Sequence, residues 1–150
     1  MSTLARAIEI AVLAHKGQKD KLGADYILHP LRVMARGKTD TEKICGVLHD
    51  VVEDRNWTFE ALEKEGFSSE VTSALRCVTK LLDDEDYEMF IDRVIQNPIA
   101  MQVKINDLLD NMDVTRFEEL NEIDLKRLNK YLRAYRKLKR QLDKVAQAHS

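Results

Sequence analysis

The chain has 150 residues, of which 24 are Lys or Arg and 26 are Asp or Glu, so its formal net charge is −2. This balance excludes a global electrostatic field that would recruit nucleic acid or a membrane surface. The sequence contains only 5 Gly and 2 Pro, whereas an average protein of this length has about 18 in total. Turn-rich β-sandwiches and barrels are therefore not expected.

The start of the chain has the composition of neither a secretion signal nor a membrane span. Arg6 and Glu9 interrupt the first apolar stretch, and the longest apolar run there covers residues 10–14. A membrane span requires roughly 20 apolar residues. We therefore expect a cytoplasmic protein without a membrane partner.

Apolar residues recur at helical spacing in nearly every segment. A first helix is expected over residues 4–17, with Ser2 or Thr3 as its N-cap. The stretch 16–25 holds two glycines and mostly polar side chains, which is typical of a loop. Pro30 then marks the first turn of a short helix.

The pattern Thr39-x-x-Glu42 is a capping box that opens the next helix. We expect this helix to continue without a break through the adjacent His49 and Asp50. Its apolar face consists of Ile44, Val47, Leu48, Val51 and Val52.

The second half of the chain repeats this pattern of capped amphipathic helices. Further helices are expected to begin at Thr58, at Ser68 or Ser69, after the acidic residues 83–86, at Asn97-Pro98 and at Glu122. The last of them is long and carries an apolar stripe, which we expect to pack on the domain or to pair with a second copy in a homodimer. The sequence thus predicts one all-α domain over residues 1–150.

The pair His49-Asp50 is the first candidate for a functional site. Two adjacent titratable groups in an apolar helix are expensive to bury unless a bound ion compensates their desolvation. On a continuous helix, His49 and Glu53 share one face and Asp50 and Asp54 share the neighbouring face. The alternative is a helix end whose polar residues meet water, and the dipeptide alone favours that alternative.

Two further residues strengthen the metal hypothesis. His29 precedes Pro30 at a helix start, and Asp107 lies in a strongly apolar segment. Either one could instead be structural, His29 as a cap and Asp107 as an exposed carboxylate. Together with His49 and Asp50 they form a mixed nitrogen and oxygen set that suits Mn²⁺, Fe²⁺ or Zn²⁺.

Four ordered motifs identify a family resemblance over about residues 4–116. The motifs are Ala14-His15-x-Gly17-Gln18, Asp25-Tyr26-Ile27-x-His29-Pro30-Leu31-Arg32-Val33, Leu48-His49-Asp50-Val51-Val52-Glu53-Asp54 and Val103-Lys104-Ile105-x-Asp107-x-x-x-Asn111. They resemble the HD-type hydrolase domain of RelA/SpoT homologues, and more narrowly the small stand-alone alarmone hydrolases. The resemblance implies an HD-domain helical bundle.

The resemblance also implies roles for individual residues. It implies a Mn²⁺ ion held by four ligands, which are His29, His49, Asp50 and Asp107. Glu53 and Asp54 are implied as the catalytic pair that orients and polarises the attacking water. Lys21 and Asn111 are implied to contact the nucleotide.

The loop before His29 supports phosphate binding and also departs from the family pattern. Lys19 and Lys21 lie in this loop and add positive charge for a polyanionic substrate. Family members often have Arg-Lys where this chain has Asp20-Lys21. Because that arginine would stack on a purine, we expect weak discrimination between guanine and adenine.

Basic residues follow the whole final helix, interleaved with tyrosines. They are Lys126, Arg127, Lys130, Arg133, Arg136, Lys137, Lys139, Arg140 and Lys144. Such a helix could bind RNA, but charges spread along a surface helix are usually solvated. We therefore expect a solvated face and no nucleic-acid partner, and Tyr87 receives no role.

These observations lead to one main hypothesis and two alternatives. The resemblance implies a Mn²⁺-dependent hydrolase that removes the 3′-pyrophosphate from guanosine tetra- or pentaphosphate. Since fewer than 40 residues follow Asn111, too few for the synthetase domain of long family members, we expect hydrolysis without synthesis. The first alternative is a phosphatase for another phosphorylated nucleotide, such as an adenine alarmone or NADPH. The second is a non-catalytic module that binds nucleotide or RNA.

Overall fold

The computed structural model describes residues 2–54, 57–82 and 84–148, without the side chain of Asp54. The helices in chain order are α1 (Leu4–Ala14), α2 (Leu28–Arg36), α3 (Asp40–Leu48), α4 (Val51–Asp54), α5 (Phe59–Lys64), α6 (Ser69–Val78), α7 (Tyr87–Val94), α8 (Pro98–Asn111), the 3₁₀ turn η1 (Val114–Arg116) and α9 (Glu122–Ala148). In the described ranges the only β-type pairing is one isolated bridge between Lys19 and Asp25. The predicted all-α fold is confirmed.

Side-chain caps begin most of these helices where the sequence predicts a start. Thr3, Thr39, Thr58, Ser68 and Asn97 each accept a backbone N–H from the first turn of the helix that follows. Such a cap satisfies one of the donors that a helix start leaves without an intrahelical partner. The helix starts could therefore be predicted from local chemistry.

The end of α1 and the turn η1 differ from the prediction. α1 ends at Ala14 because His15 takes the C-cap position and Gly17 then adopts a left-handed backbone with φ of 81°. α2 begins at Leu28 and has Pro30 in its first turn, as predicted. The turn η1 was not predicted, since a segment of three residues has no measurable apolar period.

The core is built around α8. This helix packs against α2, α3, α6 and α9, and five of its apolar residues are buried: Ala100, Met101, Val103, Ile105 and Leu108. α2 and α3 also pack closely on each other, because a Cβ added at Gly46 would lie only 3.3 Å from the Cα of Met34. Of the expected apolar face, Ile44, Val47, Leu48 and Val51 are buried and Val52 is half-buried.

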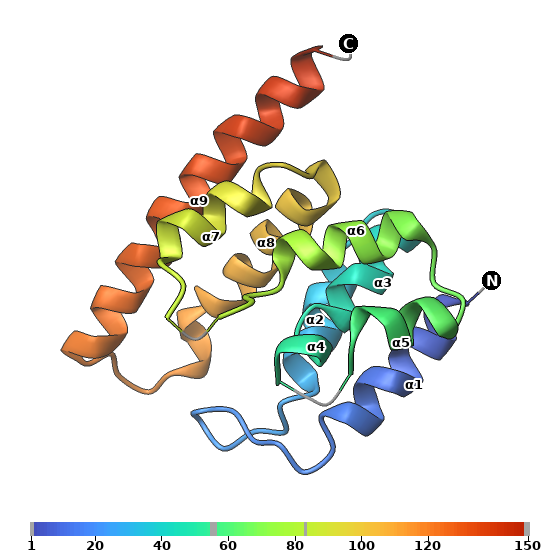
Figure 1. Ribbon diagram of the computed structural model, residues 1–150. Helices are drawn as coiled ribbons and strands as arrows, with labels where there is room; N and C mark the ends of the chain where they lie inside the picture. The colour runs from blue at the N-terminus through green and yellow to red at the C-terminus, as the bar shows by residue number, and fades with distance from the viewer. Residues whose placement is uncertain (1, 55–56, 83, 149–150) are drawn as a thin grey trace.

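The long helix α9 lies along one side of the molecule, and its last turns extend past the other helices (Figure 1). It packs on α8 and α7. Leu138 is fully buried, while Tyr131, Tyr135, Leu142 and Val145 are partly buried against the core. The predicted stripe therefore packs on the rest of this chain, whereas its pairing with a second copy stays a prediction. Among the described residues, the helices lack the length and apolarity needed to cross a membrane.

Candidate metal centre and phosphate pocket

His29 lies in the first turn of α2, where it is only 7% exposed. Its Nε2 is 2.8 Å from Oδ1 of Asp107, and its Nδ1 is 2.6 Å from Oδ2 of Asp110. Both carboxylates belong to α8 and stand one helical turn apart. The packing of α2 on α8 thus brings together residues that are 78 positions apart in the sequence.

The expectation that His49 and Asp50 lie inside a continuous helix is wrong. α3 ends at Leu48 and α4 begins at Val51, with His49 as the C-cap of α3. The Nδ1–H of His49 donates to the carbonyl of Gly46 over 2.6 Å, so the imidazole occupies a backbone acceptor at the end of the helix. The break directs His49 and Asp50 toward His29.

The Nε2 atom of His49 is the clearest indication of a missing positive partner. It is buried and has no hydrogen-bond partner within the described structure. Oxygen atoms of two carboxylates surround it, with Asp50 Oδ2 at 3.1 Å and Asp107 Oδ1 at 3.3 Å. A divalent cation at this position could bind the imidazole nitrogen and neutralise the negative charges of the two carboxylates.

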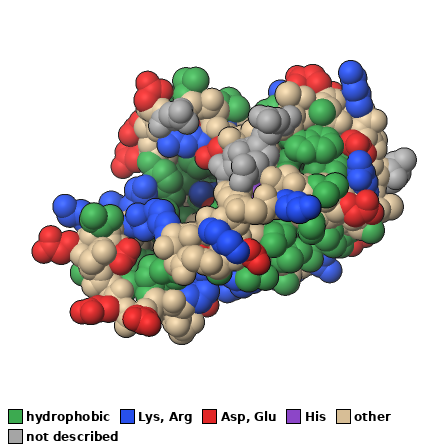
Figure 2. All heavy atoms as spheres, turned by 90° about the horizontal axis from the view of Figure 1, so that it is seen from below, with side chains coloured by type: hydrophobic (Ala, Val, Ile, Leu, Met, Phe, Trp, Pro, Cys, Tyr) green, Lys and Arg blue, Asp and Glu red, His purple; other side chains and the backbone are tan. Residues whose placement is uncertain are grey.

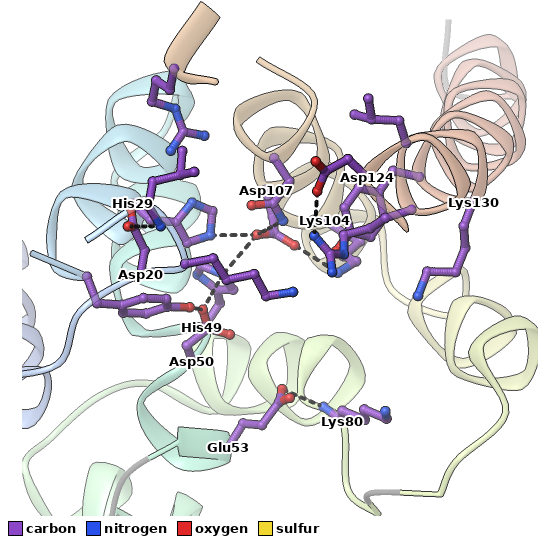
Figure 3. Close-up of a pocket in the computed structure, with 18 of the residues that line it drawn as sticks. Asp20, His29, His49, Asp50, Glu53, Lys80, Lys104, Asp107, Asp124 and Lys130 are labelled. Atoms are coloured by element: carbon purple, nitrogen blue, oxygen red, sulfur yellow. Dashed lines mark hydrogen bonds and ion pairs between the residues drawn. The ribbon is translucent and has the colours of Figure 1, made fainter. Parts of the chain in front are cut away.

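The positions of the ligand atoms agree with this interpretation. One ligand atom each from His29, His49 and Asp50 lie within 4.8 Å of one another. Asp107 contacts both imidazoles through Oδ1, while its Oδ2 accepts from Lys104 Nζ at 2.8 Å. Figure 3 shows these side chains converging from α2, α8 and the α3–α4 junction. The donor set of imidazoles and carboxylates fits a divalent metal ion.

The charges in this cluster depend strongly on one another. Burial would raise the pKa of Asp50, but the neighbouring His49 outweighs it and lowers that pKa to about 2. Burial would likewise raise the pKa of Asp107, and the ammonium of Lys104 together with both imidazoles holds it well below its usual range. The pKa of His49 is raised, because Asp50 and Asp107 outweigh the effect of burial. The carboxylates are therefore ionised and able to bind a cation at neutral pH.

Glu53, one of the two predicted catalytic residues, lies beside this cluster. Glu53 is exposed on α4, and its Oε2 accepts the backbone N–H of Lys80 over 3.3 Å. Figure 3 shows its carboxylate apart from the four converging residues. The side chain of Asp54 lies outside the described part of the structure. Although a continuous helix would place His49 and Glu53 on one face, Glu53 does not belong to the group of ligand atoms that includes His49.

A cavity of about 500 Å³ opens directly onto the cluster. Besides His29, His49, Asp50, Asp107 and Glu53, its lining includes the three predicted substrate residues, which are Lys19, Lys21 and Asn111. Lys19 forms an ion pair with Asp25, and Asn111 donates to Asp107 Oδ1 over 3.3 Å. Figure 2 shows Lys and Arg side chains gathered around a hollow on this face of the molecule. The predicted substrate residues thus share one pocket with the candidate ligands.

The pocket also contains cations that the sequence did not assign to it. Lys80 and Lys104 line it, and Arg116 reaches it from η1. The basic residues of α9 were expected to form a solvated face, and two of them, Arg127 and Lys130, line the pocket together with Tyr131. A sequence signal existed, because residues 127, 130 and 131 share one helix face.

Tyr87 likewise has a place in the pocket, although the sequence assigned it no role. Lys130 Nζ lies 4.6 Å from the centre of its ring. His15, by contrast, lies outside the ligand cluster. It is buried, its Nδ1 pairs with Gln18 Oε1 at 2.8 Å, and its ring packs on Tyr26.

The comparisons with known proteins agree with the geometry of the site. No family model matches the chain. A probable GTP pyrophosphokinase of Mycobacterium leprae is 34% identical over 129 residues, 78% of this chain and 16% of that protein. A guanosine-3′,5′-bis(diphosphate) 3′-pyrophosphohydrolase of Aquifex aeolicus is 33% identical over 120 residues, 73% of this chain and 17% of that protein. The chain thus spans about a sixth of the length of these relatives.

A solved structure has the same fold. It is described as a metazoan ortholog of SpoT that hydrolyses ppGpp and plays a role in starvation responses. Its TM-score is 0.69 at 24% identity, over 100% of this chain and 97% of that one. The predicted resemblance to the RelA/SpoT-type HD domain is therefore confirmed, by sequence over about three quarters of the chain and by fold over its whole length.

Proposed function

We propose that residues 1–150 form a single HD-type phosphohydrolase domain that removes the 3′-pyrophosphate from guanosine tetra- or pentaphosphate, giving GDP or GTP and pyrophosphate. The observation that carries this proposal is that the candidate metal ligands and a basic pocket lie next to each other. A cluster of two imidazoles and two carboxylates, in which His29, His49 and Asp107 are buried and Asp50 is half-buried, lines a pocket that is rich in Lys and Arg. The printed name of the Aquifex aeolicus relative supports the reaction.

The metal would be held by His29, His49, Asp50 and Asp107, and Mn²⁺ is the ion we expect. When bound, such an ion supplies Lewis acidity toward a phosphate oxygen and lowers the pKa of water. Mg²⁺ and Ca²⁺ prefer oxygen ligands. A mixed set of two imidazoles and two carboxylates therefore suits Mn²⁺, Fe²⁺ or Zn²⁺ better. Lys104 keeps Asp107 ionised and holds its second oxygen in place.

Glu53 and Asp54 would act on the attacking water. Because Glu53 lies at the pocket wall, outside the group of ligand atoms, it can accept a proton from water without occupying a ligand position. A positioned carboxylate of this kind contributes about 10²- to 10⁴-fold to a rate. The backbone N–H of Lys80 orients this carboxylate.

The cations of the rim would bind the phosphates. The pKa of Lys21 is lowered, mainly by burial and also by the nearby positive charge of Arg127. Two cations that repel each other across a pocket create a favourable position for a polyanion between them. Lys19, Asn111 and Lys130 complete this wall of the pocket.

The test is turnover of guanosine tetraphosphate in the presence of Mn²⁺, measured as released pyrophosphate. Wild-type protein should release it, whereas His49→Ala and Asp107→Ala should lose both bound metal and turnover. Asp92→Asn is a matched control, since Asp92 pairs with Lys137 on the surface away from the pocket. Unchanged metal content in both ligand variants would contradict the assignment.

A second set of substrates tests the alternatives. Adenine alarmone and NADPH should be assayed in parallel for released pyrophosphate and phosphate. Turnover of only these nucleotides would replace the guanosine substrate by another phosphorylated nucleotide. Absence of turnover across the whole panel, with nucleotide binding retained, would identify a binding module.

A further inference from the structure

Asp110 is a buried carboxylate that the proposed reaction does not use. It lies on α8, is 1% exposed and does not line the pocket. Its Oδ2 is 2.6 Å from Nδ1 of His29. A buried ionised group far from water requires both charge compensation and hydrogen bonds.

Two arginines from different elements supply that compensation. Arg32 donates from Nε to Oδ1 over 2.7 Å and from Nη2 to Oδ2 over 3.1 Å. Arg116 donates to the Asp110 carbonyl over 2.7 Å, and its Nη2 is 3.7 Å from Oδ2. The carboxylate is thereby fixed in orientation by α2 and by η1.

A comparison with His49 indicates what this carboxylate does. The Nδ1–H of His49 donates to the carbonyl of Gly46, which can only accept, so the proton of the neutral imidazole stays on Nδ1. For His29, Asp110 takes the place of that carbonyl at Nδ1, while Asp107 faces Nε2. In both residues the Nδ1 atoms face fixed acceptors and the Nε2 atoms face the same group of carboxylates.

We infer that Asp110 is a positioning residue that keeps the proton of His29 on Nδ1 and thereby presents Nε2 as a metal ligand. Arg32 and Arg116 hold Asp110 in the orientation this requires. The inference rests on the metal-dependent function proposed above, although it does not depend on which nucleotide is the substrate. Partners of this kind typically change metal affinity by about 10- to 100-fold.

The experiment measures Mn²⁺ affinity by calorimetry on metal-free protein, without any substrate. Asp110→Asn should weaken binding by about 10- to 100-fold, while the control Asp92→Asn should bind like wild type. Thermal unfolding of the metal-free variants should accompany the titration. An Asp110→Asn protein that is less stable but binds Mn²⁺ with wild-type affinity would show a merely structural ion pair and overturn the inference.

A second measurement needs no variant. Long-range ¹H–¹⁵N correlation on wild-type protein loaded with diamagnetic Zn²⁺ reports which nitrogen of His29 carries the proton. We expect a protonated Nδ1 and a metal-bound Nε2, and metal on Nδ1 would overturn the inference. If wild-type protein binds neither ion, the proposed function fails as well, whereas equal affinities of wild type and Asp110→Asn contradict the positioning role alone.

Discussion

The ammonium group of Lys104 lies 2.8 Å from Oδ2 of Asp107, one helical turn away on α8. Both side chains are almost completely buried, and the pKa of Lys104 is raised because the charge of Asp107 outweighs the effect of burial. A buried lysine beside a candidate metal ligand remains charged only because that carboxylate is ionised. The pair therefore couples the charge of the pocket to the charge of the metal site.

Replacement of Lys104 by Met tests this coupling. The variant should bind Mn²⁺ about 10- to 100-fold more weakly, because Asp107 loses the group that fixes its second oxygen. Calorimetric titration of the metal-free protein measures the effect. Lys137→Met removes a lysine whose Nζ is 2.7 Å from Asp92 at the surface and should leave the affinity unchanged. Equal affinities for both variants would show that Lys104 is not needed to orient Asp107.

Glu53→Gln separates chemistry from metal binding. The amide keeps the shape of the side chain but cannot accept a proton from water. We expect a wild-type metal content and a kcat reduced by about 10²-fold or more. Elemental analysis and steady-state kinetics on the same sample measure the two quantities. A variant that loses its metal would place Glu53 among the ligands instead.

Arg127→Ala tests whether α9 contributes to substrate binding. If Arg127 contacts a phosphate, its loss should raise KM for guanosine tetraphosphate by about 10- to 150-fold, since a hydrogen bond between charged groups contributes roughly 1.5–3 kcal/mol. Arg133→Ala is the matched control, because Arg133 is exposed on the same helix and does not line the pocket. The same KM for both variants would show that Arg127 does not bind the substrate and belongs to the solvated face that the sequence predicted.

Asp20 has a structural task that bears on base preference. Its Oδ1 accepts the backbone N–H groups of Leu22 and Ala24, each over 2.9 Å, and so closes the loop that carries Lys21. Asp20→Ala should open this loop and raise KM, whereas Asp20→Asn keeps an acceptor and should change KM little. Asp20→Arg would introduce a group able to stack on a purine but would also remove the loop closure.

The effects of Asp20→Arg can be separated by ratios of kcat/KM. Loss of loop closure should lower kcat/KM for guanine and adenine nucleotides alike. A guanidinium stack, which contributes on the order of 1 kcal/mol, should favour guanine relative to Asp20→Ala. An unchanged ratio of guanine to adenine in Asp20→Arg would exclude stacking at this position.

The helices could be predicted from the sequence because their signals are local. Caps such as Thr39 and Ser68 act on backbone groups three residues away, and the apolar period lies within each helix. The break at His49 could not be predicted in this way. It depends on the bond between the imidazole and Gly46 and on the carboxylate of Asp107, which α8 supplies.

Some residues of the candidate site could likewise be predicted from the sequence, and others could not. His29, His49, Asp50 and Asp107 were proposed from their local sequence context and from the family resemblance, and the structure brings them together. Asp110 and Arg127 were not found, because their local surroundings look like those of exposed polar residues. Only the packing of α8 on α2 and of α9 on α8 gives them their neighbours.

Acid should weaken one contact between α7 and the loop that precedes it. Arg93 donates to both carboxylate oxygens of Glu85 over 2.9 and 2.7 Å and also to the carbonyls of Arg76 and Thr79. The hydrogen bond from Arg93 lowers the pKa of Glu85. A lowered folded-state pKa stabilises the fold above the ordinary glutamate value of about 4.3, and this stabilisation is lost as the pH falls through the folded-state pKa.

Glu85→Gln should therefore lower the free energy of unfolding at pH 7 by at most about 1 kcal/mol, and the difference from wild type should shrink as the pH falls below about 4.3. Urea unfolding at pH 7 and pH 3 measures both quantities. Glu119→Gln, an exposed glutamate, is the control and should follow wild type at each pH. A constant difference for Glu85→Gln would show that the glutamate acts through packing and not through its charge.

The close approach of α2 and α3 at Gly46 determines more than packing. His29 lies on α2 and His49 ends α3, and their ring centres are 5.5 Å apart. Since a Cβ at Gly46 would meet the backbone of Met34 at 3.3 Å, a larger residue would move one histidine relative to the other. Packed interiors resist continuous deformation. If His29 and His49 hold a metal ion as proposed, a contact between two backbones would therefore limit the ionic radius that they accept, at a residue that would itself touch no ion.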